Sequence, residues 1–186
     1  MTRFATALGM LAIAIGTTTA IAQTQIADGP TYTADGKLEF PKDYRKWVYL
    51  STGFDMSYLE NASRTTHTLG NVFVNPSAYE SFLKTGTWPD KTVLVLEVRN
   101  ASNENSLLKG GQYQVGVAHT EVHLKDSARF EGGWGFFGFP NQTPAQMIPR
   151  TATCYSCHAE HGVVDTTFVQ FYPTLLPIAR EKKTLR

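Results

Sequence analysis

Cysteine is scarce in this chain, whose 186 residues include only Cys154 and Cys157. Two cysteines exclude a zinc site built from four of them. Long apolar runs are also missing, because the apolar residues 5–16 fall short of the roughly 20 residues that cross a bilayer. The chain has no internal repeat and no low-complexity segment. These absences are typical of a single globular domain with one distinctive cysteine motif.

The N-terminal segment has the pattern of an export signal. Arg3 supplies the positive charge, residues 5–16 form the apolar region, and Ala20-Ile21-Ala22 matches the small-x-small cleavage rule. We expect residues 1–22 to be a signal peptide, with an uncleaved membrane anchor as the alternative. Cleavage would remove Arg3 and no acidic residue, leaving 16 basic and 16 acidic residues. A formal charge of zero argues against nucleic acid or an anionic membrane surface as a partner.

The two cysteines lie in the motif Cys154-Tyr155-Ser156-Cys157-His158, which spells C-x-x-C-H. This pattern is the attachment signature of a c-type haem. Two thiols three residues apart can add to the two vinyl groups of one haem, and the adjacent imidazole then reaches the iron. The motif therefore predicts one covalently attached haem c with His158 as the iron ligand. Haem of this type is attached outside the cytoplasm, so we expect a periplasmic protein.

C-x-x-C also occurs in redox dithiols and in zinc sites. A site with two cysteines and two histidines would need His161, and the spacing to His158 is too cramped for the usual zinc finger. A thioredoxin-like dithiol normally opens a helix within a βαβ unit, and no such pattern is visible here. Haem attachment is therefore the preferred interpretation.

Hydrophobic patterning predicts several strands and a few helices. Pro76 at a first helical position and Gly86 just past the end delimit a helix that Asn75 would cap. The motif predicts a helix beginning near Thr151 or Thr153, and Asp165 would cap a final helix. A short helix is expected over residues 41–47, and strands are expected over residues 48–54, 71–74, 92–98, 113–124 and 133–139, with a flexible connection over 100–112.

This order of elements predicts an α+β fold dominated by strands, an antiparallel sheet with a few short helices and the haem on a C-terminal helix. We expect residues 23–39 to be a flexible leader and residues 40–186 to form a single haem domain. A strand-dominated chain is unlike the small all-helical cytochromes that carry electrons.

The chain resembles the cytochrome P-460 and cytochrome c′-β family of periplasmic haem proteins over about residues 40–173. The resemblance is carried by blocks in a fixed order, namely Pro41 to Val48, Asn71 to Pro76, Lys84-Thr85-Gly86, Trp88-Pro89-Asp90, Lys125-Asp126-Ser127 and the C-terminal block from Cys154 to Pro173. It implies a strand-rich, usually dimeric protein with one c-type haem whose sixth iron position is open or weakly held. Some members oxidise hydroxylamine with the help of a lysine bonded to the haem and a distal carboxylate. Others lack the lysine bond and bind nitric oxide in an apolar pocket.

Two positions point in different directions within this resemblance. The place of the cross-linking lysine is taken by Leu96, just before Glu97, and leucine cannot form the bond. The distal carboxylate aligns with Glu121, which would act as a catalytic base. Glu121 lies between His119 and His123 at a spacing of two, so a solvated polar strand face is the alternative. Together with Leu96, Phe54 and Phe73 are candidate walls of the haem pocket, although each also suits an ordinary core.

The sequence therefore favours a haem protein that binds or converts a small nitrogen species such as nitric oxide. Oxidation of hydroxylamine or peroxide with Glu121 as base is the alternative. An electron-transfer protein is the second alternative, for which Met56 or Met147 would supply a sixth ligand to the iron. Whether the chain is an enzyme stays open. Expected partners are the small-molecule ligand, a periplasmic electron donor or acceptor, and a second copy in a homodimer.

Overall fold

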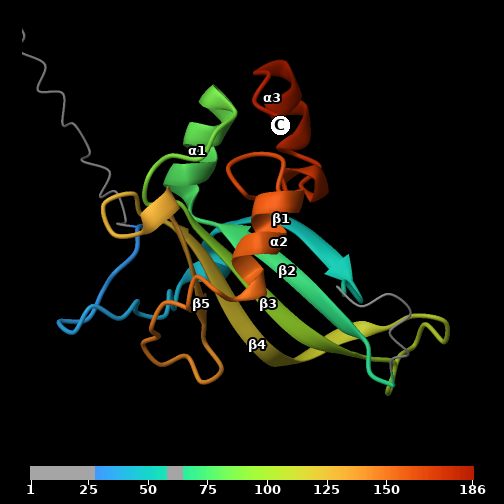
Figure 1. Ribbon diagram of the computed structural model, residues 1–186. Coiled ribbons are helices and arrows are strands. Elements are labelled where there is room, and N and C mark those ends of the chain that lie inside the picture. The colour runs from blue at the N-terminus through green and yellow to red at the C-terminus, as the bar shows by residue number, and fades with distance from the viewer. Residues whose placement is uncertain (1–27, 58–64) are drawn as a thin grey trace, which may run out of the picture.

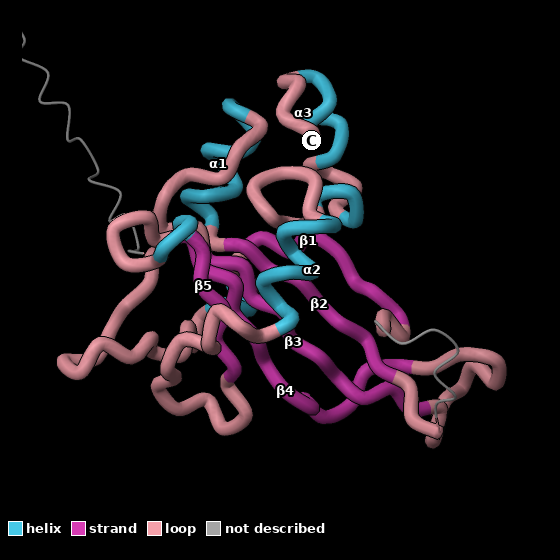
Figure 2. Tube along the Cα trace, viewed as in Figure 1, coloured by secondary structure: helices cyan, strands magenta, loops and turns pink. Residues whose placement is uncertain are grey.

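A single five-stranded antiparallel sheet forms the centre of the computed structural model, which describes residues 28–57 and 65–186. The strands lie in chain order and are β1 (Val48–Phe54), β2 (Thr68–Val74), β3 (Val93–Ser102), β4 (Tyr113–Lys125) and β5 (Trp134–Gly138). Figures 1 and 2 show the long β3–β4 hairpin reaching past the other strands. The α+β, strand-dominated fold is confirmed. The expected signal peptide lies outside the described residues.

Three α-helices accompany the sheet: α1 (Pro76–Thr85), α2 (Thr153–His161) and α3 (Leu176–Glu181). Short 3-10 turns occur at Tyr44–Lys46, Glu131–Gly133 and Val169–Phe171. Gly86 ends α1 with a φ of 72°, a left-handed conformation that glycine adopts without strain. Asn75 precedes α1, but its side-chain oxygen accepts the backbone N–H of Val93 instead of capping the helix. The carboxylate of Asp28 accepts the N–H of Ser77 in its place.

Strand register divides the sheet side chains between two faces, because directly opposite residues in antiparallel strands share a face. One row joins Val72, Leu96 and Glu121, and the row beside it joins Leu94, His123 and Phe136. We call the face that carries these two rows the motif face, because α2 packs on it. The opposite face carries residues of the other parity, including Phe73, Val95, Val122 and Phe137.

Each face of the sheet has its own hydrophobic cluster. On the motif face, Phe82 of α1, Leu94 of β3 and residues 164–179 of the C-terminal segment bury one another. On the opposite face, the cluster includes Leu38, Phe40 and Tyr44 from the segment before β1. Helices therefore cover one side of the sheet and the N-terminal segment covers the other, so the sheet is buried on both sides around its centre.

Residues 31–39 are fixed to the domain, although they were expected within a flexible leader. Leu38 is 2% exposed and exchanges two backbone hydrogen bonds with Ala145, of 3.0 and 2.9 Å. The hydroxyl of Tyr32 donates to buried Asp126 at 2.8 Å. Backbone pairing, a buried apolar side chain and a paired hydroxyl together hold this segment against the domain.

Two further expectations about local structure are wrong. The final helix does not begin at Asp165, because Asp165 and Thr166 are left-handed, with φ of 49° and 63°. They form a tight turn closed by a bridge between Val164 and Thr167. The connection expected over residues 100–112 is shorter, since β3 continues to Ser102.

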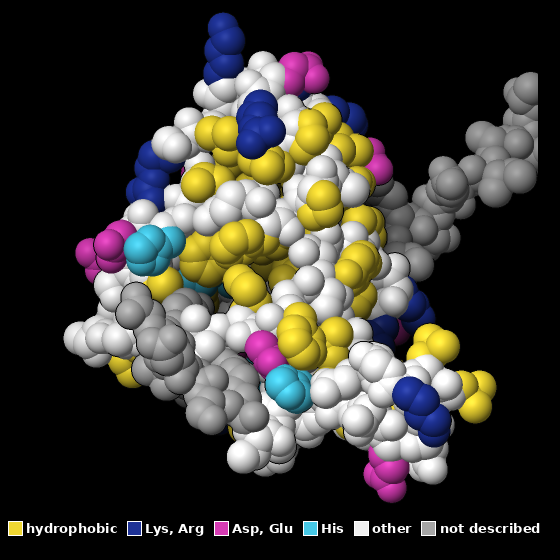
Figure 3. Space-filling view, turned by 90° about the vertical axis from the view of Figure 1, so that its right-hand side faces the viewer, with side chains coloured by type: hydrophobic (Ala, Val, Ile, Leu, Met, Phe, Trp, Pro, Cys, Tyr) yellow, Lys and Arg dark blue, Asp and Glu magenta, His cyan; other side chains and the backbone are white. Residues whose placement is uncertain are grey.

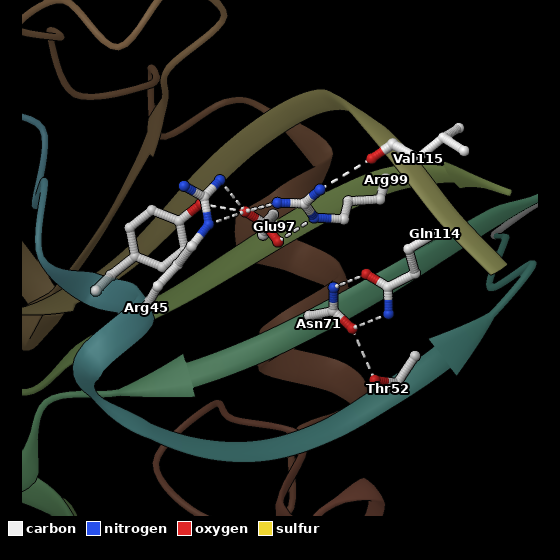
Figure 4. Close-up of polar contacts among 8 residues, drawn as sticks. Arg45, Thr52, Asn71, Glu97, Arg99, Gln114 and Val115 are labelled. Atoms are coloured by element: carbon white, nitrogen blue, oxygen red, sulfur yellow. Dashed lines mark hydrogen bonds and ion pairs between the residues drawn. The ribbon is translucent and has the colours of Figure 1, made fainter.

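A buried carboxylate ties three parts of the opposite face together (Figure 4). Glu97 of β3 is 2% exposed, and it accepts hydrogen bonds from Tyr44, from Arg45 at 2.9 Å and from Arg99 at 2.6 Å. Arg99 also donates to the carbonyl oxygen of Val115 on β4 at 2.9 Å. Burial alone would raise the pKa of Glu97, but the hydrogen bonds from Arg99, Tyr44 and Arg45 outweigh it and lower the pKa to about 2.

Replacing Glu97 with glutamine tests this cluster. The pKa of Glu97 is lower in the folded chain than the ordinary value of 4.5, so the carboxylate stabilises the fold above pH 4.5 and this contribution is lost as the pH falls through about 2. We expect E97Q to lower the free energy of unfolding at pH 7 by about 2 kcal/mol. Urea unfolding between pH 2 and 7 should show a shallower acid limb for E97Q. An acid limb equal to that of the wild type would contradict this role of Glu97. So would an equal loss of unfolding free energy in the exposed control E104Q.

Candidate haem site

α2 presents the C-x-x-C-H motif toward the sheet. The helix follows extended Ala152, begins at Thr153 and ends where the N–H of Gly162 donates to the carbonyl of His158 at 3.0 Å. Cys154 and His158 are four residues apart and therefore lie on one side of the helix. Both cysteine side chains are partly buried. The helix expected from the motif is confirmed, and it brings the two thiols and the imidazole to one surface.

His158 is anchored by a hydrogen bond from its Nδ1 to the carbonyl oxygen of Thr166, 2.8 Å away. A carbonyl oxygen only accepts, so Nδ1 carries the hydrogen and Nε2 keeps its lone pair. Burial lowers the pKa of His158 and outweighs the opposing effect of the Thr166 bond. A neutral imidazole with a fixed Nδ1–H is the form in which histidine binds a metal through Nε2.

The Thr166 carbonyl reaches His158 because of the left-handed turn at Asp165 and Thr166. The turn is held by Thr167, whose buried hydroxyl donates to the carbonyl of Val164 at 2.6 Å and accepts from the Trp88 indole at 2.8 Å. Left-handed conformations of residues other than glycine cost about 1 kcal/mol or more and persist where the surroundings enforce them. In place of the helix expected at Asp165, the chain forms a turn whose Thr166 carbonyl accepts the hydrogen bond of His158.

Three aromatic rings contact His158. Phe168 packs against it with a centroid distance of 4.2 Å. His123 and Phe136 stack in parallel with each other, 4.0 Å apart with an angle of 9° between their planes. His158 lies 4.8 Å from His123 and 4.7 Å from Phe136, with its plane steeply inclined to both. The imidazole is therefore held by its hydrogen bond and by three rings.

His123 is the residue of this site that sequence reasoning missed. It is only 7% exposed, and its Nε2 is buried without a hydrogen-bond partner in the described part of the chain. Burial, and secondarily the neighbouring His158, hold the pKa of His123 well below its ordinary value. An unpartnered buried nitrogen costs about 1–3 kcal/mol. In the sequence, the spacing of two places His123 on one polar strand face with His119 and Glu121, and no local signal separates it from them.

Leu96 and Glu121 lie side by side on the motif face, as direct cross-strand partners. Leu96 is partly buried, whereas the Glu121 side chain is 52% exposed, with one oxygen 3.4 Å from Nε2 of His119. The structure therefore brings together the two positions that point to different functions. Both lie one row along the sheet from Leu94 and His123, and thus next to the rings around His158.

Phe73 and Phe54 do not lie beside Leu96 and Glu121 on the motif face. Phe73 pairs with Val95, lies on the opposite face and packs edge-on against Tyr44, with centroids 5.6 Å apart. Phe73 follows Val72 directly in β2, and successive residues of a strand point to opposite faces of the sheet. Phe54 ends β1, is 55% exposed and stacks on His67 at 5.4 Å. Phe73 therefore lies on the face away from the motif and Phe54 at a sheet end, and neither placement supports their expected role as pocket walls.

Figure 3 shows apolar side chains gathered around a hollow on one side of the molecule. A separate cavity of about 340 Å³ lies at the N-terminal segment, between residues 28–31, residues 38–43 and Trp47. None of the motif residues lines it. Among residues 28–57 and 65–186 no group of three or more histidine, cysteine or acidic side chains is placed to hold a metal ion.

An anchored neutral imidazole beside two thiols and several aromatic rings fits a haem, whose iron needs one nitrogen ligand and whose ring needs apolar walls. The family model for cytochrome P460 matches residues 41–169, and the chain belongs to this family. Membership implies a haem cofactor. A search of curated proteins finds no match. No helix within the described residues is long and apolar enough to cross a membrane.

Gly162 offers a test of the histidine anchor. A Cβ added there would lie 2.5 Å from the backbone carbon of Thr166 and 2.7 Å from the carbonyl oxygen of His158. Both contacts are to backbone, so G162A must displace the turn that accepts the Nδ1–H of His158. We expect G162A to lower the midpoint of thermal unfolding by several degrees and to reduce haem content per chain. In the control G116A, an added Cβ meets nothing within 4 Å. Equal behaviour of the two variants would contradict the anchor.

Proposed function

We propose that this protein is a periplasmic mono-haem cytochrome, with haem c bonded to Cys154 and Cys157 and ligated by Nε2 of His158. The single observation that carries the proposal is the hydrogen bond from Nδ1 of His158 to the Thr166 carbonyl, because it leaves Nε2 as the lone-pair donor. The C-x-x-C-H spacing on one helix supports the two thioether bonds. The N-terminal signal pattern supports export.

When bound, the haem supplies an iron centre that takes up small ligands and changes oxidation state. The chain supports this centre through its own groups. Thr166 fixes the tautomer of His158 and strengthens it as a donor. Phe136 and Phe168 keep water away from the imidazole. Leu96 adds an apolar surface on the neighbouring row of the motif face.

We propose that the iron binds or slowly converts a small neutral nitrogen species, with nitric oxide as the leading candidate. An apolar surface at Leu96 admits a neutral diatomic molecule more readily than water or anions. Leucine at this position also cannot form a bond between protein and haem edge of the kind that lysine forms. Met56 is 61% exposed, and Met147 packs with the cluster of the opposite face. Neither placement supports a methionine as sixth ligand, and this favours an open iron over an electron carrier.

A second candidate function is oxidation of hydroxylamine, and one observation favours it. Glu121 is the direct neighbour of Leu96, and its carboxylate is accessible, with His119 3.4 Å away. A carboxylate beside the haem can accept a proton from a bound substrate, while His119 can pass that proton to solvent. In this case the physiological partners are hydroxylamine and a periplasmic electron acceptor.

A homodimer is also proposed. The connection between β3 and β4 exposes Leu107 and Leu108, whose exposed fractions are 95% and 78%, and Tyr113 beside them is 46% exposed. Exposed large apolar side chains close together are typical of contact surfaces. A second copy of the chain is the partner we propose for this hairpin.

One set of spectra separates the functions. Ferric, ferrous and nitric-oxide-treated protein should show an ordinary high-spin ferrous c-haem band that shifts when nitric oxide binds. A strongly red-shifted ferrous band would refute Leu96 as a residue without a bond to the haem, and a low-spin spectrum with a methionine charge-transfer band would refute the open iron.

The variant E121Q completes this experiment. If binding is the function, E121Q and the exposed control E80Q on α1 should bind nitric oxide as the wild type does, and no variant should turn over hydroxylamine with an electron acceptor. Steady turnover by the wild type that falls about 100-fold or more in E121Q, but not in E80Q, would instead establish the oxidase with Glu121 as base.

A further inference from the structure

The wall beside His158 is built from two stacked rings, one of which is a histidine. The centroid of His158 is 4.8 Å from His123 and 4.7 Å from Phe136, while these two rings are 4.0 Å apart. His158 is therefore equidistant from both, beside the stack and not on top of it. Its plane makes angles of 71° and 63° with theirs. Phe168 also packs against the imidazole, with a centroid distance of 4.2 Å, so three rings restrict its rotation.

The strands explain why this wall is rigid. His123 of β4 and Phe136 of β5 are direct cross-strand partners, and Leu94 of β3 flanks His123 on its other side. Trp134 contacts the His123 ring at a centroid distance of 4.3 Å. His123 is 7% exposed and Phe136 is also 7% exposed. Neither ring has room to swing away without disturbing the sheet.

A phenylalanine would fill the position of His123 without a polar atom. The histidine instead places Nε2 in a buried environment where it has no hydrogen-bond partner among the described residues. An unpaired nitrogen in low-dielectric surroundings exerts its full dipole on its neighbours. The ring next to this nitrogen is the imidazole of His158. How strongly that imidazole donates electrons sets the strength of its bond to iron.

We propose that His123 is a positioning residue for His158. The ring of His123 would fix the rotation of the His158 imidazole, and the dipole of its unpartnered nitrogen would tune the bond that His158 makes to a bound iron. This inference rests on the proposed ligation of haem iron by His158. It assigns His123 no contact with the substrate. The effect reaches the iron only through His158, so it should appear in properties of the iron–imidazole bond.

The test compares H123A, H123F and F137A in the exported haem protein. Phe137 is the matched control, because it is a buried ring on β5 that faces the opposite cluster and does not contact His158. Resonance Raman spectra of the ferrous protein measure the iron–imidazole stretching band, and redox titration measures the midpoint potential. Haem content per chain and thermal unfolding are recorded for all variants.

We expect H123A to broaden and lower the iron–imidazole band and to shift the midpoint potential. H123F should restore a narrow band, because the ring is present again, but it should leave the potential shifted, because the nitrogen dipole is gone. F137A should lose stability like H123A while both iron properties stay at the wild-type values.

Three results would overturn the inference. One is a wild-type band and potential in H123A. Another is the same pair of shifts in F137A, which would indicate general loosening of the core. If H123A does not fold, H123F decides, and a potential identical to the wild type would refute the dipole. A wild-type protein without haem would instead refute the proposed function and this inference with it, whereas haem-loaded protein without the shifts refutes only the inference.

Discussion

The hydrogen bond from Nδ1 of His158 to the carbonyl of Thr166 is the contact on which the candidate site depends. It spans 2.8 Å and decides three things together. It sets the tautomer, so that Nε2 carries the lone pair that can bind a metal ion. It fixes the ring plane, and it joins α2 to the segment that leads to α3. The strained turn at Asp165 and Thr166 is maintained because Thr167 and Trp88 hold it from behind.

The sheet provides the second constraint, through its two faces. On the opposite face, the buried carboxylate of Glu97 accepts hydrogen bonds from Arg45, Arg99 and Tyr44. On the motif face, the carboxylate of Glu121 is exposed, and Nε2 of His123 is buried without a hydrogen-bond partner among the described residues. Unsatisfied polar groups in an otherwise well-paired fold are commonly found where a fold carries function. Both faces carry a hydrophobic cluster, and the motif face in addition carries the exposed Glu121 carboxylate and the unpartnered nitrogen of His123.

Much of this could be predicted from the sequence. Apolar β-branched runs indicated the strands, Pro76 and Gly86 marked both ends of α1, and the C-x-x-C-H motif placed a helix at its observed position. These signals are local, and local propensity agrees with the final fold there. The resemblance singled out Leu96 and Glu121 separately, and only the strand register shows that they are neighbours.

The rest depends on contacts between distant residues. Phe73 is a candidate pocket wall in the sequence, but the face on which a strand residue lies is known only once the register is known. Asp165 resembles a helix cap in sequence, but contacts of Thr167 with Val164 and with distant Trp88 hold it in a turn instead. His123 became distinct from His119 only when β5 and α2 were seen to enclose it.

The central claim is that Cys154, Cys157 and His158 hold one haem on α2. The most direct measurement is the intact mass of the exported protein, followed by mass mapping of the peptide that contains the motif. The account predicts a mass equal to residues 23–186 plus one haem, located on that peptide and lost when both cysteines are replaced by serine. A mature chain that carries no covalent haem, or haem retained by the double serine variant, would contradict it.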